Sequence, residues 1–231
     1  MAEGAGVTAA RSGTSTRVAR SSPNHSGSHV KLLSLVRSVP EHDTMVDAII
    51  VPTARRAASM HTAVRLAADL DCTLVALCSK WSSAASVAAL AAEWNIKLVA
   101  IDTNRLPPGT IPSFATTRLL AGTRLERPAD TSYKRNLGLL LGRLAGWSRA
   151  VFLDDDIAVE RSQDLRDAVH LLDSYAAVGL INTGFPDNSV VCHANRDTGG
   201  LQDTFIGSGA LAVSCASATA WPSCSSSGAG A

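Results

Sequence analysis

Short apolar runs alternate with segments of helical periodicity through the middle of the chain, and this alternation constrains the fold more than any other feature. Each run has the length of a buried strand, and the segments between them gather apolar side chains on one helical face. The strand-like runs are residues 48–51, 73–78, 97–101, 150–153 and 176–181, and the helical segments are 57–70, 82–94, 131–144 and 162–172. Strands joined through helices pair in parallel, so we predict an α/β fold with a mostly parallel sheet flanked by helices.

Composition and charge narrow the class of protein. The 231 residues suffice for one domain or two small ones, and 46% of them are hydrophobic but only 4% aromatic, which indicates an aliphatic core. The 21 basic residues nearly balance the 20 acidic ones. This balance argues against a nucleic-acid partner, because a binder of nucleic acid usually carries a clear excess of basic residues.

Cysteine usage and hydropathy bear on the compartment. The five cysteines are odd in number and none has CxxC spacing, so reduced thiols are favoured over a zinc knuckle or a disulfide framework. No apolar run approaches the roughly 18 residues that span a bilayer. The N-terminus also lacks the apolar region of a secretory signal. We therefore expect a cytoplasmic protein without a transmembrane segment.

The two ends of the chain differ from its middle. Residues 1–44 are rich in Ser, Thr, Gly, Ala and Arg and poor in apolar side chains, which predicts a disordered extension; a transit peptide is the alternative. Residues 214–231 carry neither charge nor periodicity, and we interpret them as a low-complexity tail at a truncated or frame-shifted end. The predicted domain is residues 45–213.

Three consecutive aspartates, Asp154, Asp155 and Asp156, directly follow the apolar run 150–153. At the carboxyl end of a parallel strand they would face the crevice where α/β sheets bind ligands. A divalent cation would relieve their mutual repulsion, and hard carboxylate oxygens suit Mg²⁺ or Mn²⁺. If the strand stays extended, Asp154 and Asp156 point to the same side. The alternative is a solvated acidic turn that leads into a helix.

Basic residues begin the helical segment that precedes the aspartates. Lys134, Arg135 and Asn136 lie in its first turn, where cations oppose the helix dipole. A bound anion such as a diphosphate would reconcile the cations with the dipole, because free backbone N–H groups also point at it. The alternative is a pair of solvated basic side chains.

Polar residues also end the first and third predicted strands. Pro52, Thr53 and Arg55 form the strand-to-helix turn after the first strand, and Asp102 ends the third. The chain contains neither GxGxxG nor GxxxxGK[ST], so neither a Rossmann dinucleotide site nor a P-loop is supported. These residues could contact a nucleoside; a plain turn, and a helix cap at Asp102, are the alternatives.

Taken in order, these elements resemble the GT-A glycosyltransferases, and more loosely their bacterial polysaccharide-type members, over about residues 47–213. The resemblance is carried by Pro52–Thr53, Arg135–Asn136 before Gly138, the aspartate triplet and a Gly-Ser-Gly-Ala segment at 207–210. It implies a GT-A-like fold and transfer of a sugar from a nucleoside-diphosphate sugar to an acceptor hydroxyl. It also implies a divalent metal, Mg²⁺ or Mn²⁺, held on the diphosphate by Asp154 and Asp156.

The same resemblance implies which residues contact the sugar nucleotide. They are Pro52, Thr53, Arg55, Asp102, Lys134, Arg135, Asn136, Asp155, Gly207, Ser208 and Gly209. Inverting members use a further acidic residue, downstream of the glycine-rich segment, as the catalytic base, and here no Asp or Glu follows Asp203. Asp203 and Asp187 are the remaining candidates, unless the enzyme is retaining or the chain lacks its acceptor half.

Three other functions compete with this hypothesis. The first is an inactive nucleotide-binding fragment. The second is a phosphatase similar to the haloacid dehalogenases, with Asp154 as nucleophile, although that family usually carries its motif near the chain start. The third is a nucleotidyltransferase, whose glycine-rich basic signature after the first strand is missing here.

Overall fold

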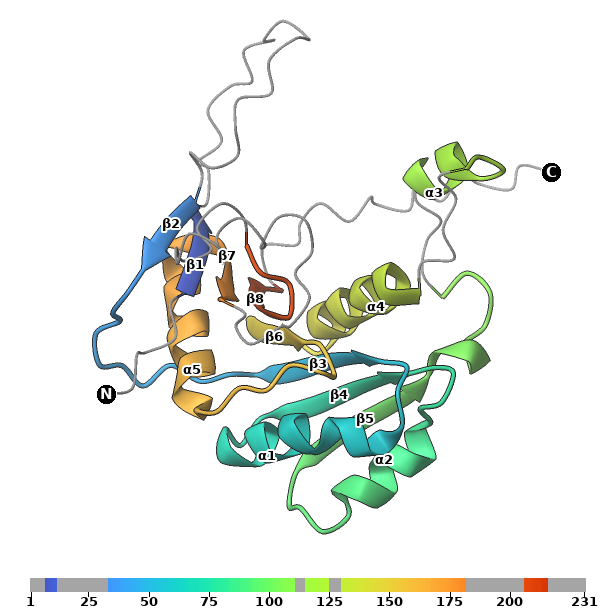
Figure 1. Cartoon of the computed structure of the whole chain (residues 1–231), viewed down its shortest axis with the longest axis horizontal. Coiled ribbons are helices and arrows are strands. Elements are labelled where there is room, and N and C mark those ends of the chain that lie inside the picture. Colours follow the sequence, from blue (N-terminus) through green and yellow to red (C-terminus); the bar gives the residue numbers. More distant parts are fainter. Residues whose placement is uncertain (1–6, 12–32, 111–114, 125–129, 182–205, 216–231) are drawn as a thin grey trace, which may run out of the picture.

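The computed structural model describes residues 7–11, 33–110, 115–124, 130–181 and 206–215 (Figure 1). In chain order the elements are β1 Val7–Arg11, β2 Leu33–Val36, β3 Ala48–Thr53, α1 His61–Asp69, β4 Thr73–Cys78, α2 Ala84–Ala91, β5 Lys97–Asp102, α3 Ala115–Leu120, α4 Asp130–Leu144, β6 Arg149–Leu153, α5 Ser162–His170, β7 Tyr175–Leu180 and β8 Ala210–Ser214. No helix in these ranges is long and apolar enough to cross a membrane.

All the described strands belong to one sheet, in the order β2-β1-β7-β8-β6-β3-β4-β5. Strands β6, β3, β4 and β5 are parallel neighbours, and β8 inserts antiparallel between β6 and β7. Since β1 is antiparallel to both β7 and β2, only β1 and β8 oppose the common direction. The predicted α/β fold with a mostly parallel sheet and flanking helices is confirmed.

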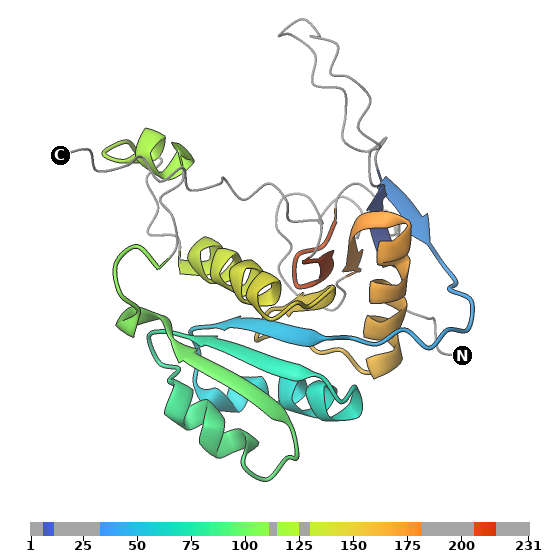
Figure 2. The ribbon, with the colours of Figure 1, turned by 180° about the vertical axis from the view of Figure 1, so that it is seen from behind.

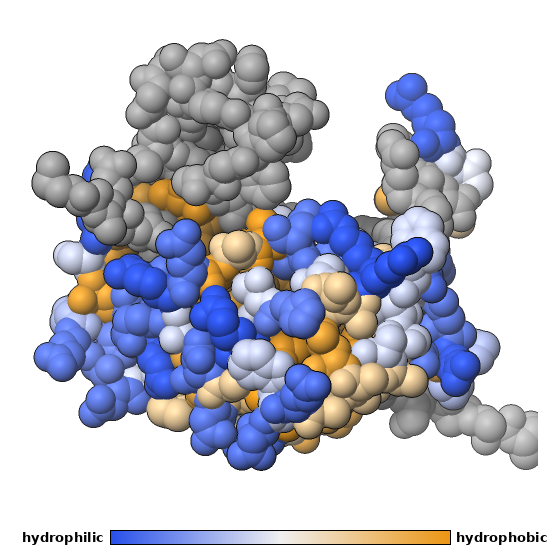
Figure 3. Space-filling model, turned by 60° about the horizontal axis from the view of Figure 1, so that its bottom comes forward, coloured by the Kyte–Doolittle hydropathy of each residue, from blue (hydrophilic) through white to orange (hydrophobic). Residues whose placement is uncertain are grey.

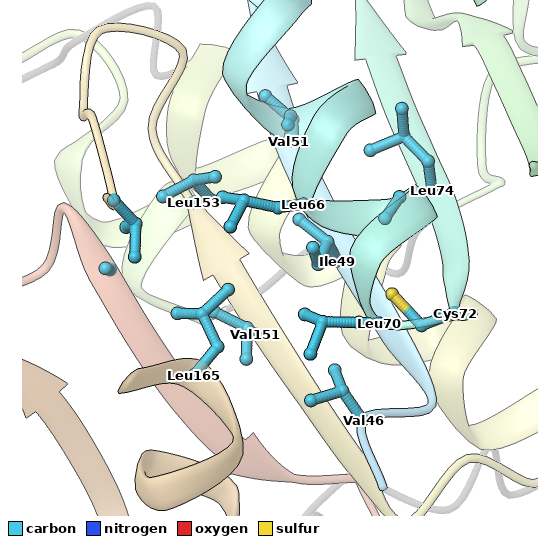
Figure 4. Close-up of a cluster of buried hydrophobic side chains, with 14 of the residues drawn as sticks. Val46, Ile49, Val51, Leu66, Leu70, Cys72, Leu74, Val151, Leu153 and Leu165 are labelled. Atoms are coloured by element: carbon cyan, nitrogen blue, oxygen red, sulfur yellow. The ribbon is translucent and has the colours of Figure 1, made fainter. Parts of the chain in front are cut away.

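Alternate residues of the central strands point to opposite faces of the sheet and build two separate cores. On one face, Ile49, Val51 and Leu153 pack with residues from α1, α2 and α5 (Figure 4). On the other face, Ile50 and Phe152 pack against α4, which lies on the opposite side of the sheet from α1 and α2 (Figure 2). The outer surface on the side of α1 and α2 is mixed, with polar side chains surrounding limited apolar areas (Figure 3).

Helix α4 approaches the sheet through two glycines. A Cβ on Gly138 would lie 2.8 Å from Ile50 Cγ2, and one on Gly142 would lie 2.6 Å from Cys215 Sγ. The apolar spacing of the predicted helical segment 131–144 places Leu137, Leu140, Leu141 and Leu144 on one face, but Leu144 is 75% exposed. The prediction was wrong at Leu144 because it counted only large side chains, whereas the missing side chains let the helix lie close to the strands.

Part of the segment 1–44, for which the composition predicts disorder, is described by the structure and includes strands β1 and β2. Strands β1 and β2 extend the sheet beyond β7 through backbone hydrogen bonds, which need little apolar side chain. The link to β3 is held on α5: His42 Nε2 lies 3.2 Å from Asp167 Oδ1, and Thr44 Oγ1 lies 2.9 Å from His170 Nδ1. The His42 and His170 rings stack with centroids 4.1 Å apart.

At the other end, the expected low-complexity tail began at residue 214, which is the last residue of β8. Cys215 behind it is buried, and burial raises the pKa of its thiol to about 11. Cys72, Cys78 and Cys215 are unpaired, as the odd count and spacing indicated. Residues 216–231 lie outside the described part of the chain.

Gly138→Ala should lower the free energy of unfolding by about 1–2 kcal/mol, because the added methyl group overlaps Ile50 and Phe152 and this outweighs the better helix propensity of alanine. Urea unfolding followed by circular dichroism measures the change. Leu144→Ala in the same helix is the control and should stay within about 0.5 kcal/mol of the original protein. A fully stable Gly138→Ala variant would contradict the close packing of α4.

Candidate functional site

The strand order places a topological switch point between β3 and β6. From β3 the chain proceeds through β4 to β5 on one side, and it then returns to form β6 on the other side of β3. In open α/β sheets, ligands bind outside the carboxyl ends of the strands at such a point. Thr53 ends β3 and Leu153 ends β6, so the turn at Arg55 and the aspartate triplet both follow this edge.

Pro52 contributes to the separation of the two strands. Pairing of β3 with β4 continues to Thr53 and Cys78, whereas pairing of β3 with β6 stops at Ile50 and Phe152. Pro52 has no N–H group and can donate no further ladder hydrogen bond. Beyond Ile50, therefore, β3 and β6 are no longer paired, and the side chains that follow them can meet between the two strands.

Each aspartate of the triplet has a partner from another element. Arg135 Nη2 of α4 donates to Asp154 Oδ1 at 2.9 Å. Thr53 Oγ1 donates to Asp155 Oδ2 at 2.7 Å, and Arg55 Nη1 lies 3.6 Å from Asp155 Oδ1. Arg55 Nη2 donates to Asp156 Oδ2 at 2.9 Å. Two guanidinium groups thus compensate three carboxylates.

The strand does not stay extended through the triplet. It ends at Leu153, and Ile157 N donates to Asp154 O at 3.1 Å, so Asp154–Ile157 form a turn. The condition for Asp154 and Asp156 to point to the same side is therefore not met. The two carboxylates pair instead with different arginines, Asp154 with Arg135 and Asp156 with Arg55.

Burial and charge act in opposite directions on this cluster. Burial raises the pKa of the Asp154 carboxyl above its usual value, and the charge and hydrogen bond of Arg135 only partly offset it. The hydrogen bond and negative charge of Asp156 raise the pKa of the Arg55 guanidinium. Desolvation and the repulsion between neighbouring carboxylates both disfavour the charged form of these side chains. A bound cation would relieve both effects.

The glycine-rich segment lies beside the first aspartate. Asp154 N donates to Gly209 O at 2.8 Å, and Arg135 Nη2 donates to Ser208 O at 3.1 Å. Gly207 and Gly209 are buried. A Cβ added to Gly179 would lie 2.6 Å from the carbonyl oxygen of Gly207, so the two glycines pack closely. The glycine-rich segment and the first aspartate are therefore neighbours at this edge of the sheet.

Arg135 also carries an unused donor. Its Nε is buried and has no hydrogen-bond partner among the described residues. A buried unsatisfied donor costs about 1–3 kcal/mol. An acceptor oxygen of a ligand at this edge would remove that cost.

Lys134 is placed differently from the expectation that it contacts a diphosphate. Its side chain is buried, and Nζ donates to Thr53 O and to Ser79 Oγ, both at 2.7 Å. The ammonium group therefore joins α4 to the ends of β3 and β4. A buried lysine needs such acceptors because its desolvation is costly, and its charge is directed into the protein.

Asp102 is engaged at the start of α2 instead of in the cluster. Asp102 Oδ1 accepts from Ala84 N at 2.7 Å at the start of α2, next to the Ser83 cap, so its alternative role as a helix cap is the one observed. Asn136 is half-buried on α4. The two candidate bases, Asp187 and Asp203, lie outside the described residues.

The sequence analysis missed Trp81. Trp81 is 76% exposed in the loop after β4, and its backbone N–H donates to Ala54 O at 3.3 Å, one residue before Arg55. The preceding Lys80 has a φ of 53°, a conformation that non-glycine residues rarely adopt. The residues that directly follow the first and third predicted strands were considered as ligand contacts. The same reasoning applied to the second predicted strand, 73–78, would have indicated Trp81.

No family model and no curated protein matches this sequence. What is established is an α/β fold with a mostly parallel sheet.

The donor set was also compared with the needs of a divalent metal. No group of three His, Cys, Asp or Glu side chains in the described ranges could hold a metal ion by itself. Mg²⁺, however, is commonly bound by one or two carboxylates, with water and substrate phosphates completing its shell. The Asp154 and Asp156 side chains are 33% and 41% exposed, so they fit a metal that arrives with a phosphate.

Lys134→Met should lower the free energy of unfolding by about 2 kcal/mol or more, because it removes the two hydrogen bonds that a buried charge donates to Thr53 O and Ser79 Oγ. Urea unfolding checks this. Lys97→Met is the matched control, since Lys97 is exposed and forms only a 3.7 Å ion pair with Asp71. Equal stability of the two variants would contradict the structural role of Lys134.

Proposed function

We propose that the protein is a GT-A-like glycosyltransferase that binds a nucleoside-diphosphate sugar at the carboxyl ends of β3 and β6 and transfers the sugar to an acceptor hydroxyl. The observation that carries the proposal is the cluster at the switch point. There the aspartate triplet, Arg55, Arg135 and the segment around Ser208 lie in mutual contact. These are the elements on which the family resemblance rests, and the fold brings them together from distant parts of the sequence.

The chain's own residues have defined tasks in this proposal. Asp154 and Asp156 would hold Mg²⁺ or Mn²⁺, and the metal, when bound, supplies Lewis acidity to the departing diphosphate. Arg55 and Arg135 add positive charge at the same edge, and the unused Nε of Arg135 suits a phosphate oxygen. Asp155 is held by Thr53 and Arg55, which keeps the turn in place.

Trp81 extends the proposed site towards the nucleoside. Strands β6 and β4 both flank β3, so their ends are separated by two strand spacings, roughly 9–10 Å. A nucleotide whose diphosphate lies at the aspartates can therefore reach across β3 and stack its base on the exposed Trp81 ring. Such stacking contributes about 1–3 kcal/mol per base.

Binding without transfer is the second candidate function. In the described part of this edge, Asp102 and the three aspartates each have a hydrogen-bond or ion-pair partner, and none is left as an unengaged base. An inverting transfer needs such a base, whose help is worth about 10²–10⁴-fold in rate. A turnover assay with sugar nucleotides and simple acceptors, run beside a binding assay, separates the two functions.

We also propose a cytoplasmic location, because the three described cysteines are unpaired.

Asp156→Asn should weaken Mn²⁺-dependent binding of a nucleoside diphosphate by about tenfold or more, since it removes a proposed metal ligand while preserving shape. Calorimetry with UDP, GDP, ADP, CDP and dTDP, with Mn²⁺ and with EDTA, measures the affinity. Asp173→Asn is the matched control, because Asp173 also pairs with one arginine, Arg149, away from this edge. If every nucleotide binds both variants equally well, the metal role of the triplet is refuted.

Trp81→Leu should weaken the binding of the tightest-binding nucleotide by about tenfold and leave the binding of inorganic pyrophosphate unaffected, because only the nucleotide has a base to stack. Calorimetry in saturating Mn²⁺ compares the two ligands. Trp94→Leu serves as the control, since Trp94 lies after α2, at the start of the loop that leads into β5. An equal loss for pyrophosphate would show that Trp81 supports the loop instead.

A further inference from the structure

We propose that Arg55 and Arg135 exchange partners when ligand binds: in the protein alone they neutralise the aspartate triplet, and when a divalent cation takes over the carboxylates they turn to the diphosphate. This inference rests on the proposed function and adds to it a mechanism that couples the metal to the nucleotide. It predicts that each of the two ligands binds weakly by itself and that each strengthens the other.

The arginines and the metal compete for the same two carboxylates, Asp154 and Asp156. Arg135 donates to Asp154 Oδ1 at 2.9 Å and Arg55 to Asp156 Oδ2 at 2.9 Å. A metal that binds these two carboxylates must approach to about 2.0–2.1 Å if it is Mg²⁺, which crowds a guanidinium from the same oxygens and adds like charge beside it. Whichever oxygen of each carboxylate the metal takes, its positive charge weakens the contacts of both arginines with the same carboxylates.

The arginines are also able to move. The Arg55 side chain is 54% exposed, and its recorded polar contacts are the two aspartates. An exposed ion pair contributes little to stability, so its exchange costs little. Arg135 keeps one further contact, Ser208 O, and has a buried Nε that lacks a partner. Lys134 contrasts with both, because its ammonium is fixed on Thr53 O and Ser79 Oγ.

The diphosphate is the destination of the freed guanidiniums. A diphosphate bound through a metal on Asp154 and Asp156 lies at the same edge, and the planar guanidinium binds phosphate oxygens in pairs. No group of three metal-ligating side chains exists among the described residues, so water or diphosphate oxygens would complete the shell of the metal, and the charged diphosphate is the stronger ligand. Metal and diphosphate thus each improve the site for the other, and such coupling is reciprocal by thermodynamic necessity.

The test is Arg55→Gln, measured with Mn²⁺ alone and with inorganic pyrophosphate in saturating Mn²⁺. Free Mn²⁺ is followed by electron paramagnetic resonance and pyrophosphate by calorimetry. We expect Mn²⁺ alone to bind about three- to fivefold more tightly, because a competing cation is gone. Pyrophosphate should bind about tenfold more weakly, because one of its guanidiniums is gone. Arg149 lies at the start of β6 and pairs with Asp173, away from the cluster. Arg149→Gln should therefore change neither affinity.

The opposite signs of the two effects identify the exchange. If Arg55→Gln weakens both ligands, Arg55 only maintains the shape of the turn, and the exchange is overturned; unchanged affinities for both overturn it as well. If the unsubstituted protein binds no pyrophosphate with Mn²⁺, the proposed function itself fails. Arg135→Lys, which keeps the charge and loses the fork, gives a second reading: it should weaken pyrophosphate and leave Mn²⁺ alone nearly unchanged. Circular dichroism confirms that each variant is folded.

Discussion

The buried ammonium of Lys134 is the interaction on which the carboxyl edge of this sheet depends. It bonds the Thr53 carbonyl and the Ser79 hydroxyl, and so fixes α4 against the ends of β3 and β4. A charge without solvent is tolerated only where acceptors surround it, and this requirement sets the position of the helix. The same turn of α4 then presents Arg135 to Asp154, so a structural lysine positions the arginine that we propose binds phosphate.

Next to Lys134, the aspartate triplet carries one more charge than its two arginine partners compensate. Three carboxylates meet two guanidiniums, the Asp155 carboxylate is nearly buried, and one guanidinium nitrogen lacks a partner among the described residues. Under the proposed function, such a cluster persists in the protein alone and also binds both a cation and an anion. A metal bound to a diphosphate offers both at once, which is the physical basis of the proposed function.

Helix α4 illustrates how packing decided what periodicity could not. Apolar spacing predicted that Leu144 would face the sheet, but it is exposed, and the contact is made where Gly138 and Gly142 carry no side chain. Strands β1 and β2 show a second limit, since β1 joins the sheet by backbone pairing with β7, and β2 joins it by pairing with β1. In both places the deciding contact is absent from any local pattern of side chains.

The sequence by itself determined the fold class, the parallel strands of the centre and the aspartate triplet at a strand end, because these depend on local periodicity and on the order of elements. It also indicated the residues around Thr53, Arg55 and Ser208. Only the tertiary structure decided that Lys134 is buried, that Asp102 caps α2, that the triplet turns after Leu153 and that Trp81 is exposed beside Ala54. These outcomes depend on which side chains from distant segments compete for the same acceptors and the same space, and that competition exists only once the chain has folded.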